Sequence, residues 1–158
     1  MFWKIIASGF GSGYSPFAPG TAGALLAALV LWALHGFCQV PFDGGWEQAG
    51  WLLPLIGCFF FLGVAAAARV EPVWGHDPSK VVVDEMVGVW IAMLGAPFSL
   101  NNLALAFVLF RVFDIWKPLG IRRMESLPGG WGVMMDDVLA GVYACLLLHV
   151  WILFLVKN

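Results

Sequence analysis

The strongest constraint on the fold is a set of apolar runs that are long enough to cross a lipid bilayer. Residues 21–40, 49–68 and 138–156 each supply the roughly 20 mostly apolar residues that a transmembrane helix needs. The chain of 158 residues is 61% hydrophobic and only 11% charged, whereas a soluble domain carries about 25% charged residues. The sequence therefore predicts an integral membrane protein, organised as a single domain over residues 1–158.

The middle of the chain is equally apolar but interrupted. Residues 86–110 contain no charged side chain, yet they include the turn-rich stretch "GAPFSLNN" at 95–102. A single span would carry that break at mid-membrane, so we expect two shorter helices over residues 78–96 and 101–117. The predicted fold class is all-α: a polytopic transmembrane helical bundle of about five spans, two of them short.

The basic residues predict how these spans are oriented. Positive side chains accumulate in cytoplasmic loops, and the connection at 41–48 contains no Lys or Arg. Basic residues instead precede the first span, follow the second, and surround the end of the fourth: Lys4, Arg69, Lys80, Arg111, Lys117, Arg122 and Arg123. We therefore expect a cytoplasmic N-terminus, an external C-terminus, and a site between helices that faces the cytoplasm.

A glycine-rich stretch, "GFGSGYSPFAPGTAG" at 9–23, leads into the first span. Glycines let backbone N–H groups approach a ligand closely, and Thr21 is predicted as the N-cap of the first span. Because a helix N-terminus binds anions through its free N–H groups and its dipole, a phosphate site is plausible here. The alternative is an ordinary capped loop that enters the membrane.

Two charged motifs lie near the ends of the two short helices. Asp84 and Glu85 are adjacent, and a salt bridge from Lys80 would explain Asp84 but not Glu85, which points about 100° away on a helix. Arg111, Asp114 and Lys117 share one helical face through their i, i+3, i+6 spacing. They are either a self-neutralising structural ladder or a phosphate-binding pair beside a metal ligand.

A third acidic motif, Asp136–Asp137, stands where the last apolar run begins. Helix capping explains one of these carboxylates but not both. The acids of the three motifs together supply the hard oxygen ligands that Mg²⁺ favours, and Arg111 and Lys117 supply positive charge for phosphate oxygens. No Cys–His set indicates zinc, and no basic patch with interleaved aromatic residues indicates nucleic acid.

Four ordered stretches, "GFGSGYSPFAPGTAG", "VDEMVGVWIAM", "FRVFDIWKP" and "GVMMDDVLAG", resemble the motifs of the bacterial phosphatidylglycerophosphatase A family from Gly9 to Gly141. The resemblance implies a Mg²⁺-dependent phosphatase of the inner membrane, with its active site facing the cytoplasm. Such an enzyme converts phosphatidylglycerophosphate to phosphatidylglycerol on the route to cardiolipin. Its implied partners are the membrane and the phospholipid substrate, with no nucleic acid and no obligate protein partner.

The resemblance also implies roles for individual residues. The catalytic acids would be Asp84, Glu85, Asp114, Asp136 and Asp137, of which Glu85, Asp114, Asp136 and Asp137 would bind Mg²⁺. Arg111, Lys117, Ser12 and Thr21 would bind the substrate phosphate. Ala24 replaces a frequent Ser and Gly120 a common Pro of the family, and neither change removes a charged group.

Two other classes of membrane protein remain as alternatives. A transporter could use membrane carboxylates as ion sites, but the acids cluster at one interface and no inverted repeat is seen. A phosphatidyltransferase-type lipid enzyme also uses metal-bound Asp, but its spaced DG…AR…G…D…D signature is absent from the sequence.

Overall fold

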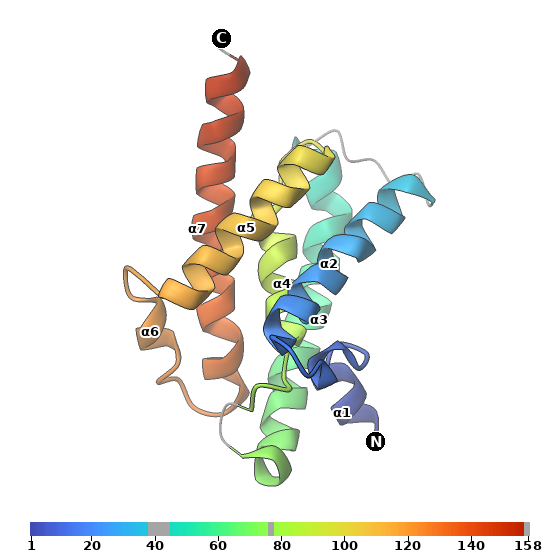
Figure 1. Ribbon diagram of the computed structural model, residues 1–158, viewed down its shortest axis with the longest axis vertical. Helices are drawn as coiled ribbons and strands as arrows, with labels where there is room; N and C mark the ends of the chain where they lie inside the picture. Colours follow the sequence, from blue (N-terminus) through green and yellow to red (C-terminus); the bar gives the residue numbers. More distant parts are fainter. Residues whose placement is uncertain (38–44, 76–77, 157–158) are drawn as a thin grey trace.

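The computed structural model describes residues 1–37, 45–75 and 78–156, and in these ranges it contains helices and no strands (Figure 1). The prediction of an all-α fold is confirmed. The helices, in chain order, are α1 (Phe2–Ala7), the 3-10 turn η1 (Ser12–Tyr14), α2 (Pro19–Gly36), α3 (Gly45–Trp74), α4 (Val83–Ala92), α5 (Leu100–Trp116), α6 (Ile121–Met124) and α7 (Gly130–Val156).

Within the described ranges, three helices are long and apolar enough to cross a membrane: α2, α3 and α7. Helix α4 has 10 residues and α5 has 17, both shorter than the roughly 20 residues of a full span. The two short helices are thus present at the predicted places, while the count of five spans stays a prediction.

Helix α4 is the centre of the bundle. It contacts α2, α3, α5 and α7, and every one of its residues except Glu85 is buried. Small residues allow this close packing, as is common between membrane helices. A Cβ atom at Gly88 would overlap the ring of Phe110, and one at Gly141 would lie 2.6 Å from the Gly88 carbonyl oxygen.

The turn between α4 and α5 confirms the predicted break at "GAPFSLNN". Helix α5 begins after Ser99, whose hydroxyl accepts a hydrogen bond from the Asn102 backbone N–H at 3.0 Å. The fully buried Gln48, in the first turn of α3, binds the same turn with its carboxamide. It donates to the carbonyls of Met93 and Ala96, and it accepts from the Gly95 N–H.

Three predicted helix starts are wrong. Helix α2 begins at Pro19 with Ala18 as its N-cap, because proline suits the first helical position, where no N–H is needed; Thr21 is therefore not the cap. Helix α4 begins at Val83 and not at 78, since the Val82 N–H bonds the Ala7 carbonyl instead.

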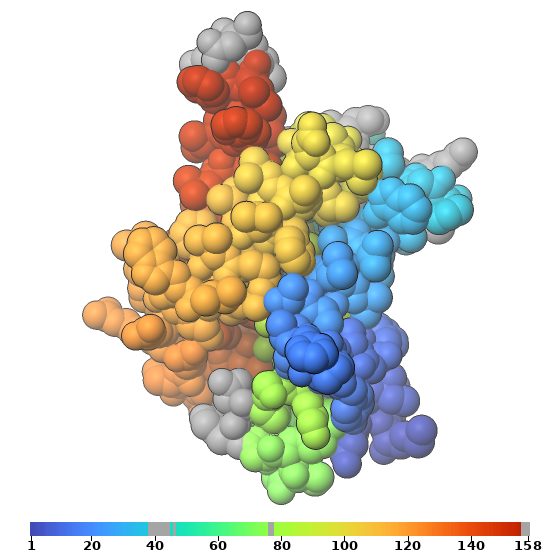
Figure 2. All heavy atoms as spheres, in the orientation of Figure 1, coloured from blue at the N-terminus to red at the C-terminus, as the bar shows by residue number. Residues whose placement is uncertain are grey.

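The third correction concerns α7. This helix begins at Gly130, so Asp136 and Asp137 lie inside it rather than at its N-terminus. Neither carboxylate caps the helix. The C-terminal part of α7 extends beyond the other helices (Figures 1 and 2) and exposes apolar side chains such as Val150, as expected for a surface that contacts lipid tails.

Candidate active site

The acidic motifs converge on one cavity of about 350 Å³. It lies where α2, α4 and α7 have their N-terminal parts and α5 ends, with the segment leading into α4 as a further wall. Its lining residues are Ala18, Pro19, Gly20, Pro78, Ser79, Val81, Asp84, Glu85, Arg111, Asp114, Lys117, Val133, Asp136 and Asp137. Four stretches far apart in the sequence thus meet at one place.

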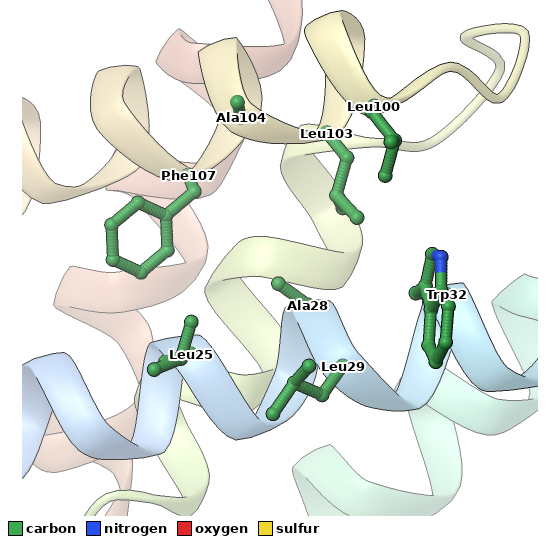
Figure 3. A pocket seen from close by; sticks show the side chains of 8 residues that line it. All are labelled: Leu25, Ala28, Leu29, Trp32, Leu100, Leu103, Ala104 and Phe107. Carbon is green, nitrogen blue, oxygen red and sulfur yellow. The ribbon is translucent and has the colours of Figure 1, made fainter.

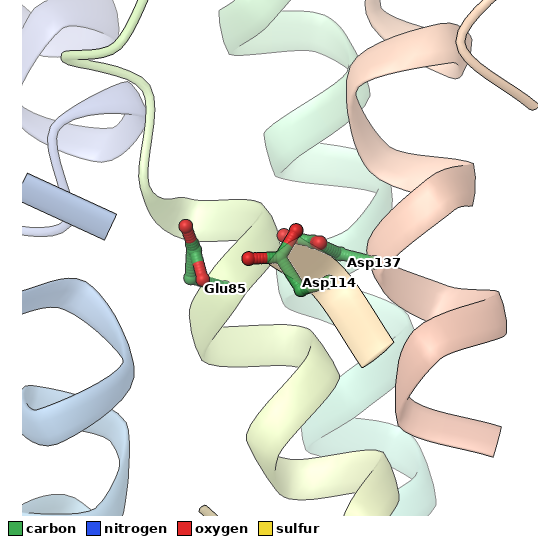
Figure 4. Close-up of side chains that lie close together, drawn as sticks. All are labelled: Glu85, Asp114 and Asp137. Atoms are coloured by element: carbon green, nitrogen blue, oxygen red, sulfur yellow. The ribbon is translucent and has the colours of Figure 1, made fainter. Parts of the chain in front are cut away.

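Three carboxylates face one another inside this cavity (Figure 4). Glu85 on α4, Asp114 on α5 and Asp137 on α7 each contribute an oxygen, and these oxygens all lie within 4.8 Å of one another. Three oxygen ligands from three helices at this spacing suit a divalent cation with an oxygen shell. We refer to these three residues as the acidic triad.

Arg111 connects two members of the triad. Its Nη1 atom donates to Glu85 and, at 2.8 Å, to Asp114 Oδ2. The side chains of all three residues are largely buried. Because Glu85 and Asp114 come from different helices, the guanidinium holds α4 and α5 together at the level of the cavity.

Lys117 joins the site from the end of α5. Its Nζ atom donates to Asp136 Oδ2 and to Glu125 Oε1, each at 2.6 Å. Burial lowers the pKa of the Lys117 ammonium, but these two hydrogen bonds outweigh burial and raise the pKa above its ordinary value. Lys117 is therefore a permanent positive charge at neutral pH.

The charges of the cavity do not balance. Five acids line it, against the two bases Arg111 and Lys117, and buried charge is costly unless it is paired. Two buried carboxylate oxygens, Asp136 Oδ1 and Asp137 Oδ1, lack a hydrogen-bond partner. A bound cation would satisfy both the excess charge and the unpartnered oxygens, so the residues present fit a divalent metal.

The first turn of α2 forms another wall of the cavity. A Cβ atom at Gly20 would overlap Glu85 Oε1 and lie 3.2 Å from Arg111 Nη1, so glycine permits the close approach of α2 to this ion pair. The N–H groups of a first helical turn have no acceptor within the helix. The wall at Gly20 therefore offers backbone donors to an anion.

The remaining predicted residues are placed differently. Ser12 and Thr21 do not line the cavity, and the Ser12 hydroxyl donates to the Gly9 carbonyl oxygen at 2.9 Å. The alternative explanation of Asp84, a salt bridge with Lys80, is not seen among the described residues, and the Lys80 Nζ lies 5.8 Å from the ring centre of Tyr14. Asp84 lines the cavity, and its Oδ1 accepts from the Glu85 N–H at 2.9 Å.

Sequence reasoning missed Gly20, Ser79 and Glu125 as parts of the site or of its ion pairs. Gly20 belongs to the glycine-rich stretch, whose flexibility predicted a close backbone approach without naming the position. Glu125 follows Lys117 at eight residues, directly after the short helix α6, and this spacing does not by itself indicate an ion pair. Ser79 carries no signal in the sequence that distinguishes it from other loop residues.

Apolar helices of membrane-spanning length that enclose buried acids and bases define a class: an integral membrane protein with a polar site built between its helices. The phosphatidylglycerophosphatase A family model matches residues 5–152, and the chain belongs to this family. It is accordingly a phosphatase, a hydrolase of phosphoric monoesters.

Individual relatives agree with this assignment over nearly the whole chain. The phosphatidylglycerophosphatase A of Escherichia coli K12 is 37% identical over 93% of this chain and 81% of its own length. That of Haemophilus influenzae is 39% identical over 89% of this chain and 82% of its own length.

A protein of Bacteroides thetaiotaomicron that carries the provisional name phosphatidylinositol-3-phosphatase is 54% identical, over 92% of this chain and 91% of its own length. No solved structure matches the chain with significance.

Proposed function

We propose that this protein hydrolyses phosphatidylglycerophosphate to phosphatidylglycerol and phosphate. The observation that carries the proposal is the acidic triad of Glu85, Asp114 and Asp137, which lies beside Arg111 and Lys117 in a single cavity. The cation would be Mg²⁺, with Asp136 as a further ligand through its unpartnered oxygen. The whole chain would act as one membrane-embedded domain in the bacterial inner membrane, with this cavity open to the cytoplasm.

Different groups in the cavity would bind different oxygens of the phosphate. Arg111 and Lys117 would donate hydrogen bonds to phosphate oxygens, as charge-assisted donors do most strongly. The first-turn N–H groups of α2 at Gly20 would bind a further oxygen. When bound, Mg²⁺ would neutralise negative charge on the transferring phosphoryl group.

Proton transfer is assigned to Asp84. This carboxylate lines the cavity but lies outside the acidic triad, so it is available to take a proton from the attacking water. The bond from the water oxygen to phosphorus forms, and the bond from phosphorus to the glycerol oxygen breaks. The proton removed from water is the one that the leaving glycerol oxygen requires.

The headgroup has a second candidate. The relative with the provisional name phosphatidylinositol-3-phosphatase is more similar to this chain than the two named phosphatidylglycerophosphatases. Both headgroups carry a phosphomonoester on a polyol that a phosphodiester joins to the diacylglycerol, so the same cavity chemistry serves either. They differ in the polar group that must fit between the phosphate and the bilayer.

Phosphate release by the purified protein in detergent micelles decides between them. We expect kcat/KM for phosphatidylglycerophosphate to exceed that for phosphatidylinositol 3-phosphate at equal chain length and equal surface concentration. A preference of tenfold or more for the inositol lipid would overturn the proposed headgroup and leave the phosphatase chemistry in place.

A further inference from the structure

An apolar groove of about 420 Å³ lies between α2 and α5, a volume in the range of ligand pockets. Figure 3 shows its side chains facing one another across the two helices. The floor is closed, because Ala28 and Leu103 are only 8% and 7% exposed. The walls are open, because Leu25, Leu29 and Leu100 are each more than half exposed.

The groove lies on the same two helices, α2 and α5, that contribute Gly20 and Arg111 to the acidic cavity. On α2, Thr21, Leu25 and Leu29 follow one another at i+4 spacing and form a stripe along the helix. The stripe starts next to Gly20, which lies in the cavity wall. On α5, Phe107 lies one turn before Arg111. Because residues four apart share a helix face, one end of the groove opens beside the groups proposed to bind the phosphate.

The distance from the acidic cavity to the far end of the groove matches one leaflet of a bilayer. Leu100 and Trp32 mark its far end (Figure 3). At 1.5 Å per residue, Leu100 lies about 16 Å along α5 from Arg111, and Trp32 about 18 Å along α2 from Gly20. Half of the hydrocarbon core of a bilayer is about 15 Å thick.

We propose that the groove between α2 and α5 holds one acyl chain of the lipid whose phosphate occupies the acidic cavity. This proposal rests on the proposed function, in that the substrate is a lipid phosphomonoester. The groove makes the enzyme select a membrane-anchored substrate, because apolar contact along its length is available to a diacyl lipid and not to a water-soluble phosphate ester.

A second apolar groove supplies the control. It measures about 390 Å³, lies between α5 and α7, and includes Leu147, Val150 and Phe154. On α7, Leu147 lies about 15 Å along the helix from Asp137, and on α5 Leu109 points about 200° around the helix from Arg111. This groove therefore does not open at the acidic cavity. It faces the same lipid surroundings without a connection to the phosphate.

Photo-labelling of the parent protein tests the occupant directly. The probe is phosphatidylglycerophosphate with a diazirine in one acyl chain, and the reference is phosphatidylcholine with the same chain. We expect the phosphomonoester probe to label the α2–α5 groove at least fivefold more than the α5–α7 groove, and the reference to label both alike. Equal labelling of the two grooves by the phosphomonoester probe would overturn the proposal.

A filled groove gives a second, kinetic test. Ala104→Trp places an indole in the α2–α5 groove at an exposed position, and Val150→Trp does the same in the control groove. We expect Ala104→Trp to lower kcat/KM at least tenfold for a long-chain substrate and not for a short-chain, water-soluble analogue. Val150→Trp should change neither.

The two proposals fail in distinguishable ways. If Ala104→Trp leaves the long-chain substrate unaffected, or lowers both substrates equally, the acyl-chain groove is wrong while the phosphatase activity stands. If the parent protein releases no phosphate from phosphatidylglycerophosphate, the proposed function is wrong, and unselective labelling of the two grooves then rejects the acyl-chain site as well.

Discussion

Adjacent residues Asp136 and Asp137 have different surroundings inside α7. Asp136 accepts a hydrogen bond from Lys117 at 2.6 Å with one oxygen, and its other oxygen has no partner. Asp137 is 3% exposed, belongs to the acidic triad, and also has an oxygen without a partner. Both acids are therefore placed to bind the proposed cation, and Asp136 also orients Lys117.

Removing the charge of Asp137 should abolish activity without unfolding the protein. Asp137→Asn keeps the size of the side chain, and we expect phosphate release to fall by at least about 100-fold, because even outer-shell metal partners are worth 10–100-fold. The matched control is Glu47→Gln, an exposed acid on α3. Near-normal turnover of Asp137→Asn in a purified, folded sample would contradict the assignment of this residue.

A methyl group at Gly20 should disturb the site selectively. The added Cβ overlaps Glu85 Oε1, which can move because it ends a flexible side chain, so the fold should survive. The displaced carboxylate leaves the acidic triad, and we expect Gly20→Ala to lower kcat by about 10- to 100-fold, the cost of small misplacements at a reacting centre.

The control for Gly20→Ala is Gly57→Ala, because a Cβ atom at Gly57 meets nothing within 4 Å. Thermal unfolding of both variants should resemble that of the parent, and only Gly20→Ala should lose activity. Equal activity of the two variants would show that α2 does not need to approach Glu85 closely.

Which acids and bases belong to the cavity could be predicted from the sequence, but their partners could not. Lys80 is the basic residue four positions before Asp84 and one possible partner for it, yet Lys80 lies over Tyr14. Glu85 instead pairs with Arg111 on another helix. Such pairs depend on how each helix is rotated about its axis, and packing between helices decides that rotation.

At the scale of the elements, α4 is a short helix held at both ends by its neighbours. Its C-terminal end and the following turn depend on Gln48 of α3, which satisfies three backbone groups. Its N-terminal end carries Asp84 and Glu85 into the cavity. The buried carboxamide thus fixes the end of α4 that is remote from the chemistry.

Replacing this carboxamide should cost stability and not catalysis. Gln48→Leu leaves the Gly95 N–H and the Ala96 carbonyl without partners, while the Met93 carbonyl keeps the Ala96 N–H. Each lost partner costs about 1–3 kcal/mol, so we expect Tm to fall by several degrees. Activity per folded molecule should stay within twofold of the parent. The control is Asn101→Ala at an exposed position of α5. An equally large fall in the Tm of this control would contradict the claim that the Gln48 hydrogen bonds stabilise the turn.

The existence and order of the apolar helices could be predicted from run length and from the "GAPFSLNN" break. The residues at which the helices start could not be predicted, and α7 shows the reason. A charged pair is normally taken as the border of a span, but Asp136 and Asp137 lie inside the helix, where Lys117 donates a hydrogen bond to Asp136. Only the three-dimensional arrangement supplies that partner.

At the scale of the whole molecule, residues from all four quoted motifs meet at one end of the bundle. Helix α2 starts there, α5 ends there, and α4 and α7 place their N-terminal parts there. The bias of Lys and Arg toward the connections at this end predicts that it faces the cytoplasm.

Reporter fusions test this orientation. A fusion after Gly129, in the connection that leads into α7, should report a cytoplasmic location, and one after Gly45, at the start of α3, should report the external side. The basic residues near Gly129 keep the connection that leads into α7 on the cytoplasmic side. An external signal at Gly129 would place the cavity on the wrong face for a cytoplasmic substrate.

The metal dependence of phosphate release from phosphatidylglycerophosphate by the parent protein in detergent tests the role of the cavity. We expect EDTA to abolish the release and added Mg²⁺ to restore it with saturation. We also expect the Mg²⁺ concentration needed for half-restoration to rise in Asp136→Asn. Full activity in the presence of EDTA would contradict the central claim that the buried acids of this cavity hold a catalytic divalent cation.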